Sequence, residues 1–350
     1  MAMHAVICIM NTDTVRGFPP EAAHNGEHPP MLIHLEQVCS SPAIYKLYIP
    51  LTGNALKNLN CYVLTDHGES LVIDTGFRNE ECRTALMGGL KELGVSPEHT
   101  KLFLTHLHSD HCGLAEYFDY PDTTIYMGEA EYKRLQGIIA NISAKATWDS
   151  NAMLMAEGFP EEDLRTATET NPARIFMSSR PFPVTFVHGG DILQVGGVKL
   201  EVLSVPGHTP DQMILYLPEQ KILFSGDHVL FDITPNITCW PGVRDPLGDY
   251  LKSLDKILTY EIETVFPGHR NLSDKTLPQR IQEIKRHHKR RLSEVREVLR
   301  AHPGANAYEV ASHLTWSLHG ATWETAPKSQ QWFAVGETIA HLNHLRASDK

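Results

Sequence analysis

The pattern of hydrophobic and polar positions in the early part of the chain predicts strands arranged around a helix. Short segments rich in apolar and β-branched residues predict strands at residues 45–49, 60–65, 70–74 and 101–105. Residues 79–93 instead carry apolar side chains at helical spacing, and Gly94 marks the end of that predicted helix. The order of strands and helix is typical of an α/β fold.

A second group of strands is predicted downstream of about residue 184. These strands are residues 191–195, 198–205, 213–217 and 221–225. Between the two groups, residues 128–182 show helical patterns, with one helix predicted at 129–142 and another beginning at Pro160. We interpret this segment as a helical insertion between the two halves of one α/β domain.

From residue 277 onward the pattern is helical again. Apolar residues at helical spacing predict one long helix that ends before Pro303–Gly304, and two shorter helices at 306–314 and 328–345. We therefore predict an N-terminal arm and lead-in at 1–44, a main domain at 45–276 and a helical C-terminal domain at 277–350.

Composition is that of an ordinary globular protein. Of the 350 residues, 42% are hydrophobic and 21% are charged. Six cysteines are scattered without a CxxC pair, which is typical of reduced thiols. No apolar run reaches membrane-spanning length, and the first residues lack the features of a signal peptide. We expect a cytoplasmic protein with no membrane partner.

Charge is distributed unevenly along the chain. Residues 277–350 hold eleven Lys and Arg against seven Asp and Glu, a net charge of +4 in a chain of −11, which leaves −15 for residues 1–276. The run Lys285–Arg291 is the only basic cluster. It could be the solvated face of an amphipathic helix, or it could contact phosphates of a coenzyme-A ester or of RNA. The sequence leaves both interpretations open.

The candidate chemistry follows the predicted strand at 101–105. His106, His108, Asp110 and His111 come within six positions, on a predicted strand-to-helix turn. In an extended backbone, the side chains of His106, His108 and Asp110 would face one way, while the adjacent His111 would reach a second metal position. Imidazoles and carboxylates favour zinc, manganese or iron over calcium or magnesium. The spacing therefore predicts two neighbouring metal sites.

Motifs further along the chain complete this pattern. They are Val205-Pro-Gly-His208, Gly226-Asp227-His228 and Val265-Phe-Pro-Gly-His269, together with the turn Val72-Ile-Asp74-Thr-Gly76. From about Tyr45 to Arg270 the sequence resembles the metallo-β-lactamase superfamily. The resemblance implies a four-layer αββα sandwich, with the site in the cleft where the two sheets meet. The C-terminal helices resemble the winged-helix-like tail of the β-lactamase-like endoribonucleases and of many bacterial hydrolases.

The resemblance also implies a role for each motif residue. One metal would be held by His106, His108 and His208, and a second by Asp110, His111 and His269, with Asp227 bridging both. Asp74 would orient a ligand rather than bind metal. Two divalent transition metals are therefore expected, with zinc favoured and iron or manganese as alternatives.

The predicted metal pair determines the expected reaction. Two cations that share a water lower its pKa from about 15.7 to near 7, so the expectation is hydrolysis by a metal-bridging hydroxide, with Asp110 orienting it. There is no G-x-S-x-G elbow, H-E-x-x-H helix or P-loop to suggest other chemistry. The alternative from another class is a redox or non-catalytic metal-binding protein on the same fold, and the complete ligand set argues against it.

The substrate is the least constrained part of the hypothesis. Thioester hydrolases similar to glyoxalase II, phosphodiesterases or endoribonucleases, and lactonases all share this ligand set. We favour a small thioester or related carboxylic ester over nucleic acid, because the main domain is acidic and the insertion would cover the cleft. Trp148, Met155, Phe231 and Trp240 are the candidate pocket residues, although such side chains could equally serve in packing. We expect the C-terminal domain to support the cleft or a homodimer.

Overall fold

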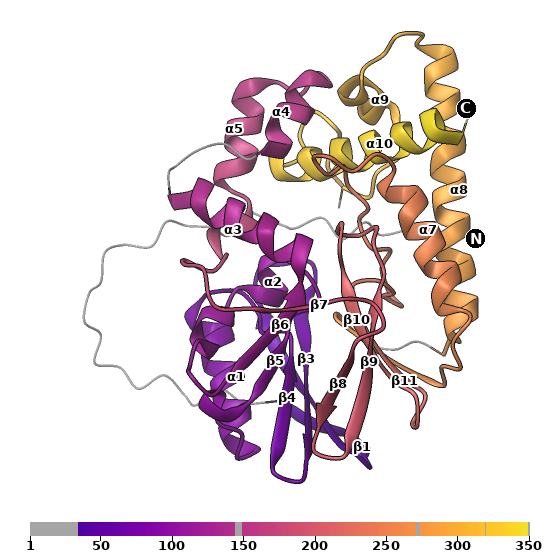
Figure 1. The fold of residues 1–350 in the computed structure, drawn as a ribbon. Helices are drawn as coiled ribbons and strands as arrows, with labels where there is room; N and C mark the ends of the chain where they lie inside the picture. The colour runs from indigo at the N-terminus through magenta and orange to yellow at the C-terminus, as the bar shows by residue number, and fades with distance from the viewer. Residues whose placement is uncertain (1–33, 144–148, 271–273, 319, 349–350) are drawn as a thin grey trace.

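The computed structural model describes residues 34–143, 149–270, 274–318 and 320–348. Two β-sheets lie against each other, with helices outside them and a further layer of helices beyond one end (Figure 1). Most of the predicted N-terminal arm, and the pocket candidate Trp148, lie outside the described residues. None of the described helices is long and apolar enough to span a membrane.

Within the described residues, the first sheet contains seven strands in chain order. They are β1 (Leu35–Ser40), β2 (Ala43–Leu51), β3 (Lys57–Asp66), β4 (Glu69–Ile73), β5 (Lys101–Phe103), β6 (Thr124–Gly128) and β7 (Thr185–Val187). β1 to β4 pair antiparallel, whereas β4 to β7 pair parallel. Parallel neighbours need long crossover connections, and α1 (Glu80–Glu92) and α3 (Glu129–Ser143) lie in two of them. The edge strand β1 was not predicted from the sequence.

The second sheet contains five strands, and β11 and β12 are its only parallel pair in the described chain. In spatial order they are β12 (Thr264–Pro267), β11 (Ile222–Gly226), β10 (Met213–Leu217), β9 (Val198–Ser204) and β8 (Ile192–Val195). Helix α7 (Pro246–Ile257) connects the parallel pair. Its N-cap Asp245 accepts from the backbone N–H of Gly248, which fixes the start of the helix.

Apolar side chains fill three layers of core around the sheets. Phe103 and Leu64 of the first sheet meet Leu215 and Phe224 of the second in a shared cluster between them. Separate clusters join the outer face of the first sheet to α1 and α3, and the outer face of the second to α7. This arrangement confirms the predicted αββα sandwich.

Short helices occupy the connections around the first sheet and the insertion. They are the 3₁₀ turns η1 (Pro97–His99) and η2 (Ala115–Phe118) and the α-helices α2 (Ser109–Cys112), α4 (Asp149–Ala156), α5 (Glu161–Glu169) and α6 (Pro172–Ile175). The helical character predicted for residues 128–182 is confirmed in the described part of that segment. α5 begins after Pro160, as predicted.

In the described residues, three helices follow the second sheet: α8 (Leu277–Ala301), α9 (Ala307–His313) and α10 (Lys328–Ser348). Thr276 and Gln279 form a capping box that starts α8 at the predicted position. The comparison with a winged helix is not confirmed, because the residues described beyond 277 include no strand. The predicted boundary between the main and C-terminal domains stays a prediction.

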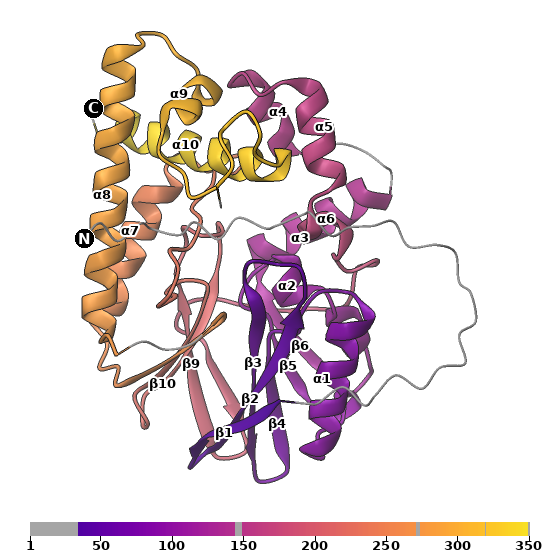
Figure 2. The ribbon, with the colours of Figure 1, turned by 180° about the vertical axis from the view of Figure 1, so that it is seen from behind.

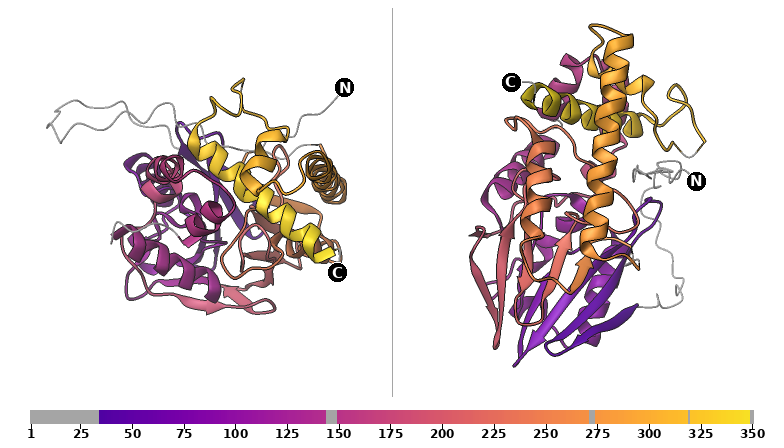
Figure 3. Two further views of the ribbon diagram at one scale, coloured as in Figure 1. Left: turned by 90° about the horizontal axis from the view of Figure 1, so that it is seen from above. Right: turned by 90° about the vertical axis from the view of Figure 1, so that its right-hand side faces the viewer.

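The C-terminal helices pack on two different parts of the chain. The first turns of α8 bury Ile281 and Ile284 in the cluster outside the second sheet. α10 crosses the end of the sandwich and contacts α4 and α5 of the insertion as well as α7 and α8 (Figures 2 and 3). α10 therefore connects the insertion to the second half of the sandwich.

The basic run on α8 is only partly exposed. Lys285 pairs with Asp255 of α7, and Arg291 is buried, where it pairs with Glu294 and lies over the Trp316 ring. His287 and His288 are also buried. Two cations of the run therefore have structural partners, whereas Arg286, Lys289 and Arg290 are exposed, and this packing gives no direct support to the alternative of a phosphate contact.

Candidate metal centre

The motif that follows β5 folds back on itself rather than continuing as a strand. β5 ends at Phe103, and α2 begins at Ser109, so Asp110 and His111 lie on a turn of helix. The backbone is therefore not extended throughout the motif, and the prediction that extended geometry separates His106, His108 and Asp110 from His111 is wrong. The backbone N–H of Thr75 donates to the carbonyl of His111 at 2.8 Å, which ties α2 to the end of β4. His106 and His111 are completely buried.

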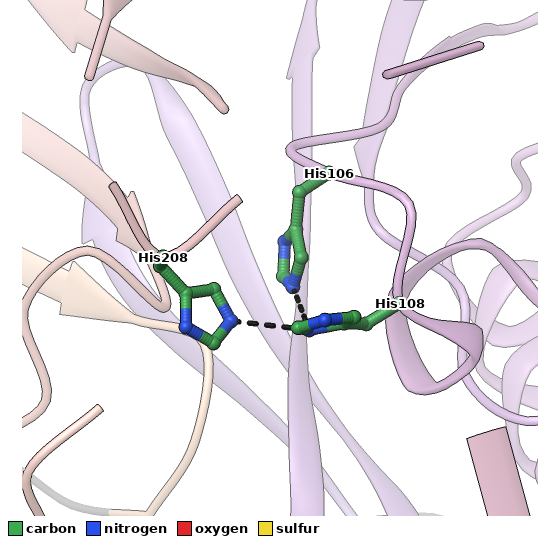
Figure 4. A group of neighbouring side chains, drawn as sticks. All are labelled: His106, His108 and His208. Carbon is green, nitrogen blue, oxygen red and sulfur yellow. Dashed lines mark hydrogen bonds between the residues drawn. The ribbon is translucent and has the colours of Figure 1, made fainter. Parts of the chain in front are cut away.

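One group of three histidines could hold a metal ion. His106 Nε2 lies 2.9 Å from His108 Nδ1, and His208 Nε2 lies 3.1 Å from the same atom (Figure 4). Nitrogens bound tetrahedrally to one zinc ion at about 2.0–2.1 Å would be roughly 3.3 Å apart, close to these separations. The three nitrogens therefore have the spacing of ligands that share one cation.

A second group combines two histidines with a carboxylate. His111 Nε2 and His269 Nε2 lie 3.1 Å apart, and Asp110 Oδ2 lies 3.3 Å from His269 Nε2. These three residues could hold a metal ion of their own. Mixed nitrogen and oxygen ligands suit a divalent transition metal better than calcium or magnesium.

Asp227 lies between the two groups. Its Oδ1 is 3.4 Å from Nε2 of both His111 and His269, while its Oδ2 is 3.7 Å from His208 Nε2. Oδ1 is buried without a hydrogen-bond partner among the described residues. A buried carboxylate oxygen normally needs a hydrogen bond or a cation. The two oxygens of Asp227 therefore face different groups.

Three of the histidines are oriented by the nitrogen that faces away from the centre. The Nδ1–H of His208 donates to the carbonyl of Asn236, and that of His269 to the carbonyl of Asn58, each at 2.8 Å. His111 donates in the same way to Asp74 Oδ2 at 2.7 Å. These partners accept only, so in the neutral form of each ring the Nε2 lone pair faces the centre, as a metal ligand requires.

Asp74 is held in place from several sides. It follows β4 with a φ of 61°, a left-handed conformation uncommon for a residue other than glycine. Its carboxylate accepts from the Thr105 backbone N–H at 2.8 Å and from the Thr105 hydroxyl. A strained backbone with full hydrogen bonding is typical of a functional site. Asp74 contacts His111 rather than the centre itself.

Burial and nearby charges set the protonation states of the two groups. Burial lowers the pKa of His106 well below its usual range, and burial with the neighbouring His208 lowers the pKa of His108 to about 3, so both rings are neutral. Burial opposes protonation of His111, but the carboxylates of Asp74 and Asp227 outweigh it and raise its pKa well above its usual range. Such a concentration of buried negative charge attracts a divalent cation.

A residue that sequence reasoning missed supports the centre from α3. Glu131 is completely buried and accepts from the backbone N–H groups of Leu107, at 2.9 Å, and Asp211, at 2.8 Å. It thereby joins the loop of His106 and His108 to the loop of His208. Burial raises the pKa of Glu131 to about 7. A glutamate on the same helical face as Leu135 and Ile139 was the signal available in the sequence.

A cavity of about 400 Å³ opens beside the two groups. His108, Asp110, His208 and Asp227 lie on its wall. Trp240, a predicted pocket residue, also lines it, and its indole N–H donates to the carbonyl of His208 at 3.2 Å. A volume of this size suits a small molecule.

The other predicted pocket residues lie elsewhere. Phe231 is buried in the cluster outside the second sheet, and Met155 is 45% exposed, so neither contributes to the lining. Residues that sequence reasoning missed take their place: Gly137 and Ile138 of α3, and Trp332 and Phe333 of α10.

Helix α10 also reaches the metal centre through the loop that precedes α7. Asn236, whose carbonyl orients His208, donates from its side chain to the Glu337 carboxylate at 3.0 Å. The backbone N–H of Cys239 donates to the carbonyl of Gly336 at 3.1 Å. Gly336 permits this approach, because a Cβ there would lie 2.2 Å from the Thr238 hydroxyl.

Comparison with known proteins identifies the family. The family model described as "Metallo-beta-lactamase superfamily" matches residues 56–269. The human acyl-coenzyme A thioesterase MBLAC2 is 29% identical over 222 residues, 61% of this chain and 73% of that protein. The atrochrysone carboxyl ACP thioesterase of Emericella nidulans is 26% identical over 243 residues, 69% of this chain and 60% of that protein.

A solved structure agrees with this result. The crystal structure of a metallo-beta-lactamase family protein from Thermus thermophilus is similar with a TM-score of 0.71 and 30% identity, and it covers 87% of this chain and 94% of its own. Together with histidine and aspartate groups that could hold metal, these matches show that the chain is a hydrolase of the metallo-beta-lactamase superfamily.

Proposed function

We propose that this chain is a dinuclear-metal-dependent hydrolase of thioesters or related carboxylic esters. One metal would be held by His106, His108 and His208, the other by Asp110, His111 and His269, with Asp227 bridging them. Zinc is the favoured metal, with iron or manganese as alternatives. The observation that carries the proposal is that the two oxygens of Asp227 each face one group, beside a small-molecule cavity.

The protein's own residues would position the reactants. Two cations held by these side chains would supply a water of lowered pKa and Lewis acidity toward the carbonyl. Asp110, which lines the cavity and lies 3.3 Å from His269 Nε2, would orient the attacking water and accept its proton. Asp74 would keep His111 in the tautomer that presents Nε2. Trp240 would exclude bulk water on the side of His108, whose ring it stacks against at 6.1 Å.

Three observations favour a thioester over the alternatives. The two relatives named as thioesterases share this fold family, although at low identity. The cavity has a small-molecule volume, whereas a nuclease needs a groove that follows a polyanion. The net negative charge of residues 1–276 also opposes binding of a polyanion. The location in the cytoplasm and a homodimer remain part of the proposal without bearing on this choice.

The test compares substrate classes with one preparation of metal-loaded enzyme. Four substrates are assayed in parallel: hexanoyl-coenzyme A, a lactone, bis(p-nitrophenyl) phosphate and single-stranded RNA. We expect thioester hydrolysis to dominate and to be lost in Asp110→Asn. Asp122→Asn makes the same chemical change at an exposed position and should leave the activity intact. RNA cleavage or lactone hydrolysis that depends on Asp110, without thioester hydrolysis, would contradict the proposal.

A further inference from the structure

The cavity extends well beyond the metal centre, and most of its wall is apolar. The metal-facing wall carries His108, Asp110, His208 and Asp227. The apolar side chains on the remaining wall include Leu56, Leu107, Ile138, Met177, Leu230 and Ile233, besides three aromatic residues. Hydrolysis of an ester requires only the polar end. The apolar remainder offers space for a hydrophobic group attached to the reacting carbonyl.

Gly137 borders open space on the α3 side of the cavity. It lies inside α3 and lines the cavity, and a Cβ at this position would meet no heavy atom within 4 Å. Its φ is not positive, so the backbone conformation does not require glycine. Glycine is unfavourable in a helix interior. Gly137 is exposed, so contacts within the protein do not require a glycine there, whereas a ligand that occupies the space beside α3 would favour one.

Helix α10 supplies a fixed aromatic wall to the same cavity. Trp332 and Phe333 line it, with their rings packed edge to face at 5.0 Å. The indole N–H of Trp332 donates to the Asn151 side chain of α4 at 3.4 Å. Because this hydrogen bond holds the Trp332 ring to the insertion, the ring should not move aside to admit a longer ligand.

We propose that this cavity binds an unbranched apolar acyl chain of the substrate, and that Gly137 sets the length of chain that fits. The inference rests on the proposed thioester hydrolysis and specifies its substrate class. The thioester carbonyl would lie at the metal centre, and the chain would extend between α3 and the aromatic wall of α10. Lys133 and Arg134 also line the cavity. The sulfur-linked carrier would lie on the side of these charged residues, outside the apolar part.

The first test measures chain-length preference. For the wild type, kcat/KM should rise from acetyl- through hexanoyl- to decanoyl-coenzyme A by about threefold to fourfold for each methylene that becomes buried. Gly137→Leu should lower the ratio of kcat/KM for decanoyl over acetyl thioester by about tenfold or more, the equivalent of two buried methylenes. Gly137→Ala should lower it less and should raise the Tm, because alanine favours the helix.

A matched control separates cavity filling from a general effect on α3. Ala140 lies on the same helix, is exposed and does not line the cavity. Ala140→Leu should leave the chain-length ratio unchanged. An equal change in the two leucine variants would contradict a role for Gly137.

Binding of the product acid gives a readout independent of hydrolysis. Decanoate should bind wild-type protein in isothermal titration calorimetry, and Gly137→Leu should weaken that binding by about tenfold. If decanoate binds in this way but no thioester is hydrolysed, the proposed reaction fails and the apolar pocket stands. If thioesters are hydrolysed with a flat chain-length profile that Gly137→Leu does not change, the pocket inference is overturned and the proposed reaction stands.

Discussion

The metal end of the cavity and its apolar end are built in different ways. At the metal end, the candidate ligands lie in short motifs that follow apolar strands, and backbone carbonyls or Asp74 orient three of the histidines. At the apolar end, α3, the loop 230–241 and α10 meet although they are far apart in sequence. The comparison shows that candidate metal ligands can lie in short sequence motifs, whereas the wall of the apolar end forms only when distant segments pack together.

The largest effect is expected at the point shared by both metal groups. Asp227→Ala should lower kcat/KM by on the order of 10³-fold or more, because it removes the one carboxylate that faces both groups. His269→Ala touches only the second group and should cost less activity. Steady-state kinetics of both variants at saturating metal checks this order. Equal losses would mean that Asp227 serves only one group.

The apolar end should instead respond through stability. Ile339→Ala removes a buried side chain from the cluster that joins α10 to α4, α5 and α8. The free energy of unfolding should fall by about 2–5 kcal/mol. The metal content of Ile339→Ala should not change, whereas variants of the candidate ligands at the metal end should lose metal. Urea denaturation followed by elemental analysis makes the comparison, and loss of metal from a still folded variant would break it.

A smaller effect is expected one contact away from the metal centre. Asp74→Asn keeps the size of the side chain but offers His111 an amide in place of a carboxylate. Metal affinity should weaken by about 10–100-fold, as when such orienting partners are changed elsewhere. Competition with a chromophoric chelator measures it. An unchanged affinity would show that Asp74 only maintains the fold around Thr105.

The smallest effect concerns the pH dependence of the C-terminal packing. Burial lowers the pKa of His341 to about 3, and its Nε2 lies 3.2 Å from His288 Nδ1. A lowered pKa means that stability is present above the unfolded value near 6.5 and is lost as pH falls. His341→Gln should therefore reduce the stability difference between pH 7.5 and pH 5 by roughly 2 kcal/mol. Denaturation at both pH values tests this, and an unchanged difference would contradict it.

The apolar pattern predicted the strands, whereas the sandwich and the role of each motif residue were expected from the resemblance to the superfamily. Apolar runs with turns at their ends mark buried strands, and side chains that follow such strands converge at one edge of the sheets. Helix boundaries in the C-terminal part were also predictable, since caps such as Thr276 are local signals. The edge strand β1 was missed because its residues are mostly half-buried or exposed and lack a clear alternation.

What could not be predicted depends on contacts between distant segments. α10 is buried on all sides, so its sequence has no single apolar stripe to show which face meets the cavity. The side chains chosen for the pocket from their character alone, Met155 and Phe231, therefore lie away from it. The turn of helix at Ser109 also escaped prediction, because four residues are too few for a periodic signal.

The central claim is that the histidine and aspartate groups hold two metal ions joined by Asp227. Elemental analysis of the purified full chain, after equilibration with zinc and removal of excess metal, tests it most directly. The account predicts two metal ions per chain in the wild type and a loss of both in Asp227→Ala. A wild-type stoichiometry that stays at or below one, with all seven side chains intact, would contradict it.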